Sequence, residues 1–304
     1  MGSQEHVVPC PACGSIRTEH LFDAPDRALR AVPGTFPYRE CENCATVFQF
    51  PQPGEDVLAQ SYAADYGNYV DERGLAERAA EPLARREAKR LMSHANTSGT
   101  LVDLGCGTGR FLERLQYCGW AGTLRGREYS PEVARYAGDR LGIEISSGTV
   151  EDAGLEPGAQ SVIVLRHVIE HLREPVAELS RLREGLEPGG LLYLGTPDAR
   201  ALSAKVFGSK WWGYEVPRHL VVFSSDALTE ALSRAGFDIV DAWWNWSPDM
   251  WSNSLRISLD PDSPWQAFAK PTNPLTLPLF GAAAALEVAR HRSTMFSVVA
   301  RRRD

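Results

Sequence analysis

The residues near the N-terminus with the clearest chemical potential are cysteines. Cys10 and Cys13 form one C-x-x-C pair, and Cys41 and Cys44 form another. This spacing lets both thiolates of a pair approach one ion, and four thiolates complete the closed tetrahedral shell of a structural zinc site. We therefore predict a small zinc ribbon holding one structural zinc. Incidental thiols and a redox-active pair are the alternatives.

A second group of residues is a glycine-rich turn after an apolar segment. The segment 100–104 reads as a strand containing Asp103, and Gly105 and Gly107 follow before a helical pattern over 110–118. Glycines let a ligand pass close to the backbone. Dinucleotide sites instead use G-x-G-x-x-G, with amides that address a pyrophosphate. The acidic Asp103 would repel a phosphate and favours a cationic aminoacyl group.

A carboxylate follows at the end of the next expected strand. Glu128 is placed to accept hydrogen bonds from both hydroxyls of a ribose, and Ser130-Pro131 has the N-cap and first-turn residues that begin a helix. Asp103, the glycines and Glu128, in this order, predict a crevice for a positively charged aminoacyl nucleoside.

Four segments carry a resemblance to a known family: 102–110, 126–137, 167–175 and 186–197. They resemble class I S-adenosylmethionine-dependent methyltransferases of the ubiquinone-biosynthesis type, over residues 100–240. The resemblance implies S-adenosylmethionine as cofactor. It places the methionine portion on Asp103, Gly105 and Gly107, the ribose on Glu128, and the adenine beside Tyr129.

The turn expected at the adenine departs from the family pattern. Related proteins often carry an aspartate there for the adenine amine, whereas this chain has Gly148-Thr149-Val150. We expect Thr149 or a backbone carbonyl of the Thr149-Val150 turn to substitute, with Glu151 or Asp152 nearby.

A histidine-rich segment follows the expected strand 162–165. Ligands bind at the carboxyl ends of strands in an open parallel sheet, so His167 is expected to face the transferable methyl group. Three interpretations stay open for His167, Glu170 and His171. Glu170 and His171 tie the following helix to neighbouring backbone, or His167 or His171 acts as general base. In the third, H-x-x-E-H holds a metal, because it resembles the E-x-x-E-H site of quinone-ring O-methyltransferases.

A long aromatic loop after the expected strand 191–194 reads as the acceptor segment. Its Tyr-Glu-x-Pro-Arg-His motif is similar to one in zinc-ribbon methyltransferases. We expect Tyr214 and Arg218 to contact the acceptor, with Arg218 holding a phosphate or carboxylate and His219 as an alternative base. The alternative is a loop packed onto the domain by its tryptophans.

Another aromatic stripe, Tyr62, Tyr66 and Tyr69, lies in a segment of helical pattern. Residues three or four apart share one helical face. The stripe is read either as core-facing or as a flap over the cofactor or acceptor.

Composition bounds the fold and the partners. The chain has 304 residues and a net charge of −7, which disfavours a nucleic-acid partner. We expect an α/β fold: a Rossmann-like seven-stranded methyltransferase sheet with an N-terminal zinc ribbon and a C-terminal lid insertion. The expected boundaries are 1–53 for the zinc ribbon, 54–98 for a helical linker, 99–246 for the cofactor-binding domain with its acceptor loop at 198–222, 247–292 for the lid, and 293–304 for the closing strand.

Cysteine usage and hydropathy suggest the location of the chain. No secretory signal is visible, and clustered cysteines favour a reducing cytoplasm. The apolar run 275–289 is shorter than the twenty residues that a membrane span needs. A helical lid is the favoured reading of this region, and contact with a membrane surface or a lipid-linked acceptor is the other.

The combined pattern predicts methylation of a small-molecule acceptor, with O-methylation preferred. The alternatives are C-methylation of a nucleotide-linked sugar, a non-catalytic protein in which the ribbon recruits a partner, and a dehydrogenase. Intact Asp103 and Glu128 weigh against the second and third of these. The oligomeric state stays open.

Overall fold

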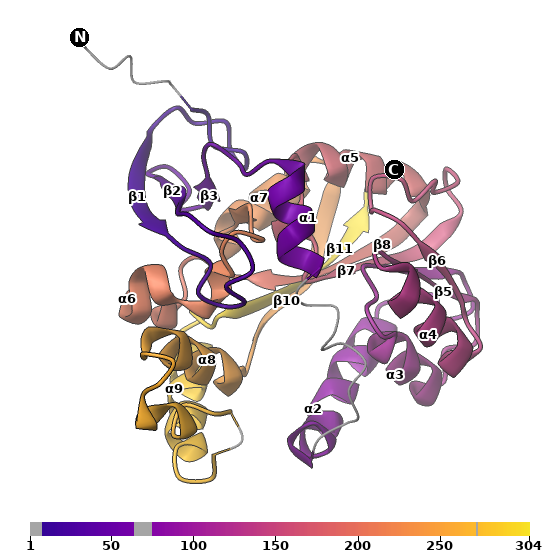
Figure 1. Cartoon of the computed structure of the whole chain (residues 1–304). Helices are drawn as coiled ribbons and strands as arrows, with labels where there is room; N and C mark the ends of the chain where they lie inside the picture. The colour runs from indigo at the N-terminus through magenta and orange to yellow at the C-terminus, as the bar shows by residue number, and fades with distance from the viewer. Residues whose placement is uncertain (1–7, 64–74, 272) are drawn as a thin grey trace.

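A twisted sheet of seven strands forms the centre of the molecule. The computed structural model describes residues 8–63, 75–271 and 273–304, which are the subject here (Figure 1). The strand order is β10-β11-β8-β7-β4-β5-β6. The bounds are β4 Leu101–Leu104, β5 Leu124–Glu128, β6 Glu144–Ser147, β7 Gln160–Arg166, β8 Leu186–Pro197, β10 Phe237–Asn245 and β11 Met295–Arg302.

The direction of the strands defines where a ligand can bind. Strands β6, β5, β4, β7 and β8 are parallel, and β11 inserts antiparallel between β8 and β10. The chain progresses outward from β4 to β6 on one side and from β7 to β8 on the other. Open sheets bind ligands at the carboxyl ends of the strands where this order reverses. The carboxyl ends of β4 and β7 therefore mark the expected crevice.

Helices cover both faces of this sheet. Their bounds are α1 Glu55–Ala63, α2 Leu75–Met92, α3 Arg110–Cys118, α4 Pro131–Leu141, α5 Pro175–Gly185 and α7 Ser225–Arg234. Apolar residues of α2 and α3 share a core with one face of β4, β7 and β8, whereas those of α5 and α7 pack against the other face. The tight turn needed after α3 falls on Gly119, at φ +94°.

A smaller sheet belongs to the N-terminal part of the chain. Its strands are β1 Thr18–Ala24, β2 Phe36–Cys41, β3 Val47–Gln49 and β9 Val221–Val222, in the order β1-β2-β3-β9. Strand β9 comes from the expected acceptor loop and pairs antiparallel with β3. The predicted boundary between zinc ribbon and acceptor loop is therefore bridged by a shared sheet.

The remaining elements connect the acceptor segment to the C-terminal insertion. They are α6 Leu202–Phe207, α8 Pro248–Ser258, α9 Leu277–Ala289 and the 3₁₀ turns η2 Ile169–His171, η3 Gly208–Lys210, η4 Trp212–Tyr214 and η5 Pro264–Ala267. Helix α8 packs against α6, η3 and η4 as well as α9. In Figure 1, α8 and α9 form a lobe below α6. Among the described helices, none combines the length and the apolar character that crossing a bilayer requires.

Candidate active site

A cavity of about 740 Å³ lies at the predicted crevice. Its volume is within the usual range of 300–1,000 Å³ for small-molecule sites. The wall comes from the loops after β4, β5, β6 and β7, from α1, and from the acceptor segment. None of its described lining residues lies in the insertion 247–292, so the region read as a lid packs on the acceptor segment instead.

The glycine turn after β4 opens one end of the cavity. Gly105 has φ +76°, and a Cβ there would lie 2.5 Å from Val168 Cγ2. Gly107 has φ +54°, with no atom within 4 Å of a Cβ position. Left-handed backbone of this kind favours glycine. Both glycines line the cavity, so the backbone itself is presented to a ligand, as the spacing predicts.

Glu128 lines the same end and is fixed by two backbone groups. One carboxylate oxygen accepts from the Gly107 N–H at 2.9 Å, and the other from the Ser130 N–H at 3.0 Å. Ser130 also caps α4 by accepting from the Val133 N–H. Because each carboxylate oxygen accepts more than one hydrogen bond, Glu128 retains capacity for ribose hydroxyls.

Asp103 lies just before the glycine turn and is not among the lining residues, which differs from the expectation that it lines the cavity. It is only 2% exposed, and Oδ1 has no hydrogen-bond partner among the described residues. Burial, with nearby Glu128, raises the pKa of Asp103 to about 7 against the opposing effect of Arg166. Asp103 is therefore a buried, unsatisfied carboxyl group behind the turn, and a cation would stabilise its charged form.

The opposite end of the nucleoside crevice is formed by the turn at 148–151. Thr149, Val150 and Glu151 line it together with Tyr129, which is 51% exposed. The carbonyl of Thr149 accepts from Arg127, and that of Val150 accepts from an arginine of α5.

The acidic candidates at this turn differ in their surroundings. Asp152 is held by the Thr149 hydroxyl at 2.9 Å and does not line the cavity. Of the two acidic residues expected near the adenine, Glu151 and Asp152, it is thus Glu151 that lines the cavity there.

His167 and His171 both line the cavity. The side chain of His167 is 53% exposed, and its φ of +57° turns the chain at the end of β7. Desolvation and the nearby Arg166 shift the pKa of His167 downward, and the exposure of the side chain limits this shift. Desolvation and the nearby His219 lower the pKa of His171 to about 3. Both imidazoles are therefore neutral at pH 7.

The segment containing Glu170 and His171 is a 3₁₀ turn rather than the start of the next helix. Helix α5 begins separately at Pro175, a residue suited to a first helical turn. The residues of H-x-x-E-H therefore do not lie on one face of an α-helix. Glu170 is fully buried and accepts from the Thr196 hydroxyl at 2.9 Å, and its backbone carbonyl accepts from the Leu220 N–H.

His219 lies behind the cavity wall and is only 4% exposed. Its Nδ1 is 2.7 Å from the carbonyl oxygen of Gly213, and its Nε2 is 2.9 Å from Glu215 Oε2. Burial would lower the pKa of His219, but Glu215 and Glu170 outweigh burial and raise it. A buried, protonated imidazole is a poor proton acceptor, so the structure does not support the predicted role of His219 as a base.

Tyr214 is also away from the cavity, contrary to the predicted acceptor contact. It is 4% exposed and packs in the N-terminal core against Trp211, with ring centroids 4.9 Å apart. For Tyr214 and Trp211 the alternative interpretation, a loop packed by its aromatic residues, is the one that the structure shows.

Arg218 does line the cavity, and Glu215 is a wall residue that the sequence did not single out. The two side chains form an ion pair. Burial would raise the pKa of Glu215, but His219 and Arg218 outweigh this and lower it to about 2. Arg218 and the His219 imidazolium behind the wall therefore share the Glu215 carboxylate at the acceptor end of the cavity.

Tyr62 of α1 completes this wall. Its hydroxyl lies 2.9 Å from His171 Nδ1, and its ring centroid is 6.1 Å from that of Tyr129. This position agrees with the flap interpretation for Tyr62, while Tyr66 and Tyr69 fall outside the described residues. Arg166, paired with Glu87 of α2 at 3.2 Å, is a further wall residue that sequence reasoning missed.

Within residues 8–63, 75–271 and 273–304, two clusters have the composition of a metal site. The ligand atoms of Glu170, His171 and His219 lie within 4.8 Å of one another. However, His171 Nδ1 is 3.0 Å from the Arg218 carbonyl, and both nitrogens of His219 are engaged as described above. Protein partners thus occupy both nitrogens of His219 and the Nδ1 of His171, so of the imidazole nitrogens in this cluster only His171 Nε2 could bind a metal.

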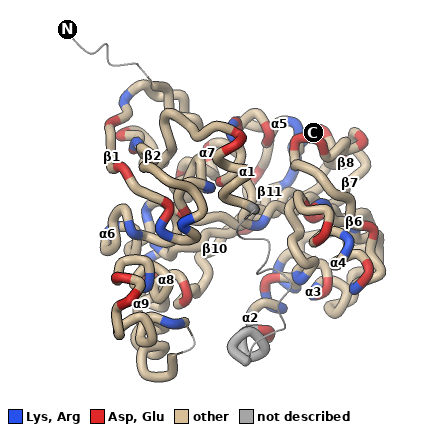
Figure 2. The backbone as a smooth tube through the Cα atoms, in the orientation of Figure 1, with Lys and Arg blue, Asp and Glu red and all other residues tan. Residues whose placement is uncertain are grey.

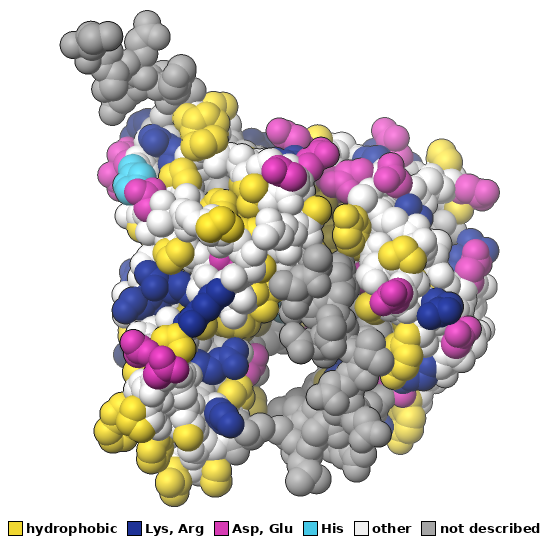
Figure 3. Space-filling model, viewed as in Figure 1, with side chains coloured by type: hydrophobic (Ala, Val, Ile, Leu, Met, Phe, Trp, Pro, Cys, Tyr) yellow, Lys and Arg dark blue, Asp and Glu magenta, His cyan; other side chains and the backbone are white. Residues whose placement is uncertain are grey.

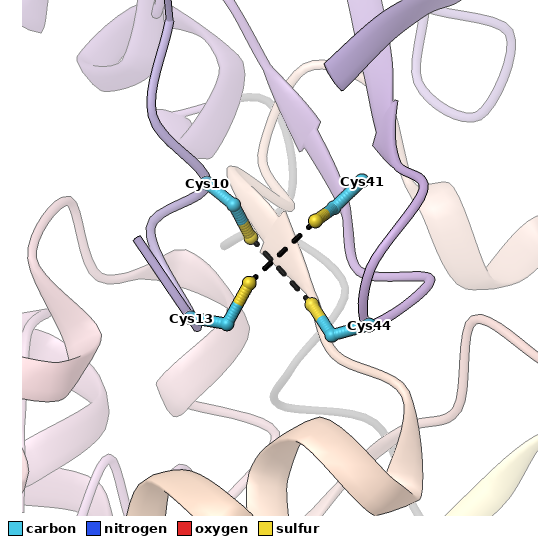
Figure 4. Close-up of side chains that lie close together, drawn as sticks. All are labelled: Cys10, Cys13, Cys41 and Cys44. Carbon is cyan, nitrogen blue, oxygen red and sulfur yellow. Dashed lines mark hydrogen bonds between the residues drawn. The ribbon is translucent and has the colours of Figure 1, made fainter. Parts of the chain in front are cut away.

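The four N-terminal cysteines form the second cluster. Their sulfurs point toward a common centre (Figure 4) and lie within 4.8 Å of one another. Cys10 Sγ is 3.7 Å from Cys44 Sγ, and Cys13 Sγ is 3.6 Å from Cys41 Sγ. Zinc–sulfur bonds of 2.3 Å in a tetrahedron require sulfurs about 3.8 Å apart. The cluster therefore fits zinc without rearrangement.

The fold and this cavity define a Rossmann-like nucleoside-binding domain, and comparison with known proteins identifies its family. Residues 73–242 match the family described as Methyltransferase domain, which is more than half of the chain. The chain belongs to this family and is a class I S-adenosylmethionine-dependent methyltransferase.

Curated relatives are similar over the same region. A Ubiquinone biosynthesis O-methyltransferase of Cereibacter sphaeroides ATCC 17025 is 28% identical over 183 residues, covering 53% of this chain and 73% of the relative. Its counterpart in Dinoroseobacter shibae is 29% identical over 152 residues, covering 46% of this chain and 60% of the relative. The chain therefore spans about three fifths to three quarters of the length of these two relatives.

Solved structures share the fold at low identity. A complex of the Haloferax volcanii Trm112 methyltransferase activator with a methyltransferase matches with TM-score 0.54 and 18% identity, covering 75% of this chain and 93% of that chain. The [4+2]-cyclase SpnF matches with TM-score 0.51 and 20% identity, covering 77% and 84%. These likenesses show the fold alone.

The residues of the cavity fit S-adenosylmethionine. The glycine turn leaves room for a ligand, and Glu128 can accept from a ribose. Asp103, directly behind the turn and outside the lining, has an unsatisfied buried oxygen. Each of these features suits one part of a cationic aminoacyl nucleoside.

Proposed function

We propose that this chain transfers a methyl group from S-adenosylmethionine to a hydroxyl group of an uncharged small-molecule acceptor. The observation that carries the proposal is that two neutral imidazoles, His167 and His171, line the same cavity as the nucleoside crevice. A hydroxyl nucleophile must lose a proton, and a neutral imidazole can accept it.

His171 is the proposed proton acceptor. Its Nδ1 lies 3.0 Å from the Arg218 carbonyl oxygen, which can only accept a hydrogen bond. The Tyr62 hydroxyl lies 2.9 Å from the same nitrogen and can accept as well as donate, so a hydrogen on Nδ1 satisfies both neighbours, whereas a lone pair there would face the Arg218 carbonyl oxygen. We therefore assign the hydrogen to Nδ1 and the lone pair to Nε2. A pKa of about 3 makes this a weak base. It suits proton removal that accompanies methyl transfer better than prior formation of an alkoxide.

Charge pairing at the acceptor end favours an uncharged acceptor. Arg218 is paired with Glu215, and Arg166 with Glu87. A diphosphate would be recognised by cations whose hydrogen bonds are available to it. This pairing disfavours both the predicted phosphate or carboxylate contact of Arg218 and the alternative of a nucleotide-linked sugar.

The protein's contribution to the reaction is mainly alignment. When bound, S-adenosylmethionine supplies an electrophilic sulfonium methyl group. The glycine turn and Glu128 fix one side of the cavity, while Tyr62, His171 and the acceptor segment fix the other. Holding two reactants in line can contribute about 7–11 kcal/mol, and general-base catalysis typically adds roughly 10²–10⁴-fold.

We infer that the four-cysteine cluster holds one structural zinc. The sulfur separations and the absence of a nearby non-cysteine ligand among the described residues support a closed site. The zinc ribbon would then have no direct part in methyl transfer.

The test is a turnover screen with the purified chain. S-adenosylmethionine carrying a ¹³C-methyl group is incubated with a panel of neutral phenols and alcohols, and products are analysed by NMR. We expect an O–¹³CH₃ product, and His171→Gln should reduce its rate by roughly 10²–10⁴-fold. A methyl group on carbon, or turnover confined to nucleotide-linked sugars, would contradict the proposal.

A further inference from the structure

The acceptor segment is bound to the N-terminal module along its backbone. Strand β9 is the edge strand of the module's sheet, and Val221 pairs with Phe48. The Gln49 N–H donates to the Leu220 carbonyl at 2.9 Å. Figure 1 shows β1, β2 and β3 gathered beside α1, next to the central sheet.

Three consecutive carbonyls at the acceptor wall are held by side chains. Gln49 Nε2 donates to the carbonyls of Pro217 and His219, at 2.7 and 2.9 Å. The Tyr38 hydroxyl also donates to the His219 carbonyl, at 2.9 Å. The carbonyl between them, that of Arg218, accepts from His171 Nδ1 at 3.0 Å. The N-terminal module thus forms hydrogen bonds to the backbone on both sides of Arg218, whose carbonyl orients His171.

Gln49 and Tyr38, whose side chains hold these carbonyls, are buried and contact each other. Tyr38 is fully buried and Gln49 is 1% exposed. Gln49 Nε2 lies 2.7 Å from the Tyr38 oxygen. The amide must present its nitrogen to this side, because its oxygen would repel two carbonyl oxygens. Gln49 Oε1 has no hydrogen-bond partner among the described residues.

We propose that Gln49 and Tyr38 are positioning residues for the acceptor side of the active site. Their hydrogen bonds fix the backbone at Arg218. The Arg218 carbonyl in turn fixes which nitrogen of His171 carries the hydrogen, so the N-terminal module sets which imidazole nitrogen faces the reaction. The inference rests on the proposed function in naming His171 as proton acceptor. The link from Gln49 to the His171 tautomer stands independently of the acceptor's identity.

A purely structural role for Gln49 and Tyr38 would lower stability without changing the tautomer. The test therefore reads the tautomer directly, using long-range ¹H–¹⁵N NMR on the full chain labelled at histidine nitrogens. His171→Gln assigns the signal among the seven histidines. We expect wild-type His171 to be protonated at Nδ1. Gln49→Met should raise the Nε2-protonated population several-fold, and Tyr38→Phe should raise it less, because it removes one of the two donors to the His219 carbonyl.

Matched variants elsewhere provide controls. Gln116→Met changes an exposed residue of α3, and Tyr136→Phe changes a partly exposed residue of α4. Neither should change the His171 spectrum. Binding of S-adenosylhomocysteine, measured by calorimetry, should stay within about twofold in all four variants, because none of these side chains lines the cavity.

Two results would overturn the proposal. One is Nδ1-protonated His171 in folded Gln49→Met and Tyr38→Phe. The other is a tautomer change that always accompanies a large loss of S-adenosylhomocysteine affinity, which would show general disruption. If Gln49→Met does not fold, Tyr38→Phe decides. A carbon-methylated product in the turnover screen would overturn the proposed function and leave the tautomer result in place.

Discussion

The two ends of the cavity are built in different ways. The cofactor end comes from three short segments, the turn after β4, the end of β5 and the turn at 148–151, and Glu128 fixes the first of these through the Gly107 N–H at 2.9 Å. The acceptor end is assembled from parts distant in sequence: Tyr62 of α1, His171 of η2, and Arg218 of the acceptor segment. Its backbone is held by the N-terminal module as well as by η2, the turn after β7.

This difference indicates that cofactor binding and acceptor binding depend on different parts of the chain. A local glycine turn can be kept for a common cofactor while the module and acceptor segment change for each acceptor. Figure 2 shows both acidic and basic residues along the described backbone, and Figure 3 shows basic side chains gathered on the left of the viewed face and acidic ones along its upper edge. Specificity for the acceptor is expected inside the cavity. Four changes test whether the two ends are independent.

The largest expected effect comes from breaking the cysteine cluster. Structural zinc contributes on the order of 10–16 kcal/mol in isolated zinc fingers. Cys41→Ser should abolish zinc binding, measured as one zinc per chain in the wild type by elemental analysis. It should disrupt the acceptor end, seen as a changed His171 NMR signal.

Binding at the cofactor end is the comparison for this experiment. S-adenosylhomocysteine affinity should change far less than the acceptor end does, and Cys118→Ser, outside the cluster, should keep its zinc. Wild-type protein isolated without any bound metal would contradict the zinc assignment.

The second-largest effect should come from removing the partly buried carboxylate of Glu215, which should destabilise the acceptor end. The change Glu215→Gln leaves protonated His219 without its partner at 2.9 Å. Breaking a buried ion pair typically costs about 3–5 kcal/mol. Chemical unfolding at pH 6 should show this loss, whereas the exposed control Glu184→Gln should be near neutral.

The pH dependence of that loss follows from the two pKa shifts. The pKa of Glu215 is lowered to about 2, so its contribution is full above pH 4.5 and disappears as the pH falls toward 2. The pKa of His219 is raised, so its contribution is full below pH 6.5 and disappears as the pH rises through the folded-state value. The difference between wild type and Glu215→Gln should therefore be largest near pH 4.5–6.5. An equal difference at pH 9 would contradict this picture.

Glu128→Ala should act on the cofactor end alone. It removes the acceptor of the Gly107 and Ser130 N–H groups as well as the proposed ribose contact. We expect S-adenosylhomocysteine affinity to fall roughly 100-fold, about 2.7 kcal/mol, by calorimetry. Glu132→Ala on exposed α4 is the matched control. Wild-type affinity in Glu128→Ala would show that the pocket is placed wrongly.

The smallest expected effect is the pH dependence of cofactor binding through Asp103. Burial raises the pKa of this carboxyl to about 7 in the free protein. A cationic ligand favours the ionised form, so affinity should rise several-fold between pH 6 and pH 8 and then level off. Asp103→Asn should flatten this dependence. A slope of the opposite sign would exclude charge stabilisation by Asp103.

The sequence was informative where structure is local. The helix over 110–118, the glycine turn, the strand end at Glu128 and the cysteine cluster could all be predicted, because each depends on residues close together in the chain. The acceptor end could not be predicted in this way. Tyr214 and Arg218 lie in one motif, yet one is in the module core and the other lines the cavity.

The roles of Tyr38, Gln49 and Glu215 depend on long-range contacts that no local pattern encodes. Gln49 contacts residues 168 and 170 positions away in the chain. The sequence shows only that Gln49 is a polar residue between Phe48 and Phe50, whereas its burial, which requires hydrogen-bond partners for the amide, is visible only in the structure.

The most direct test of the account is a crystal structure of the chain with S-adenosylhomocysteine. We predict the ribose at Glu128, the adenine beside Tyr129 and the turn at 149–151, and the sulfur facing the side of the cavity that carries His167 and His171. A cavity that excludes the ligand, or one that binds a dinucleotide with its pyrophosphate on the glycine turn, would contradict the central claim.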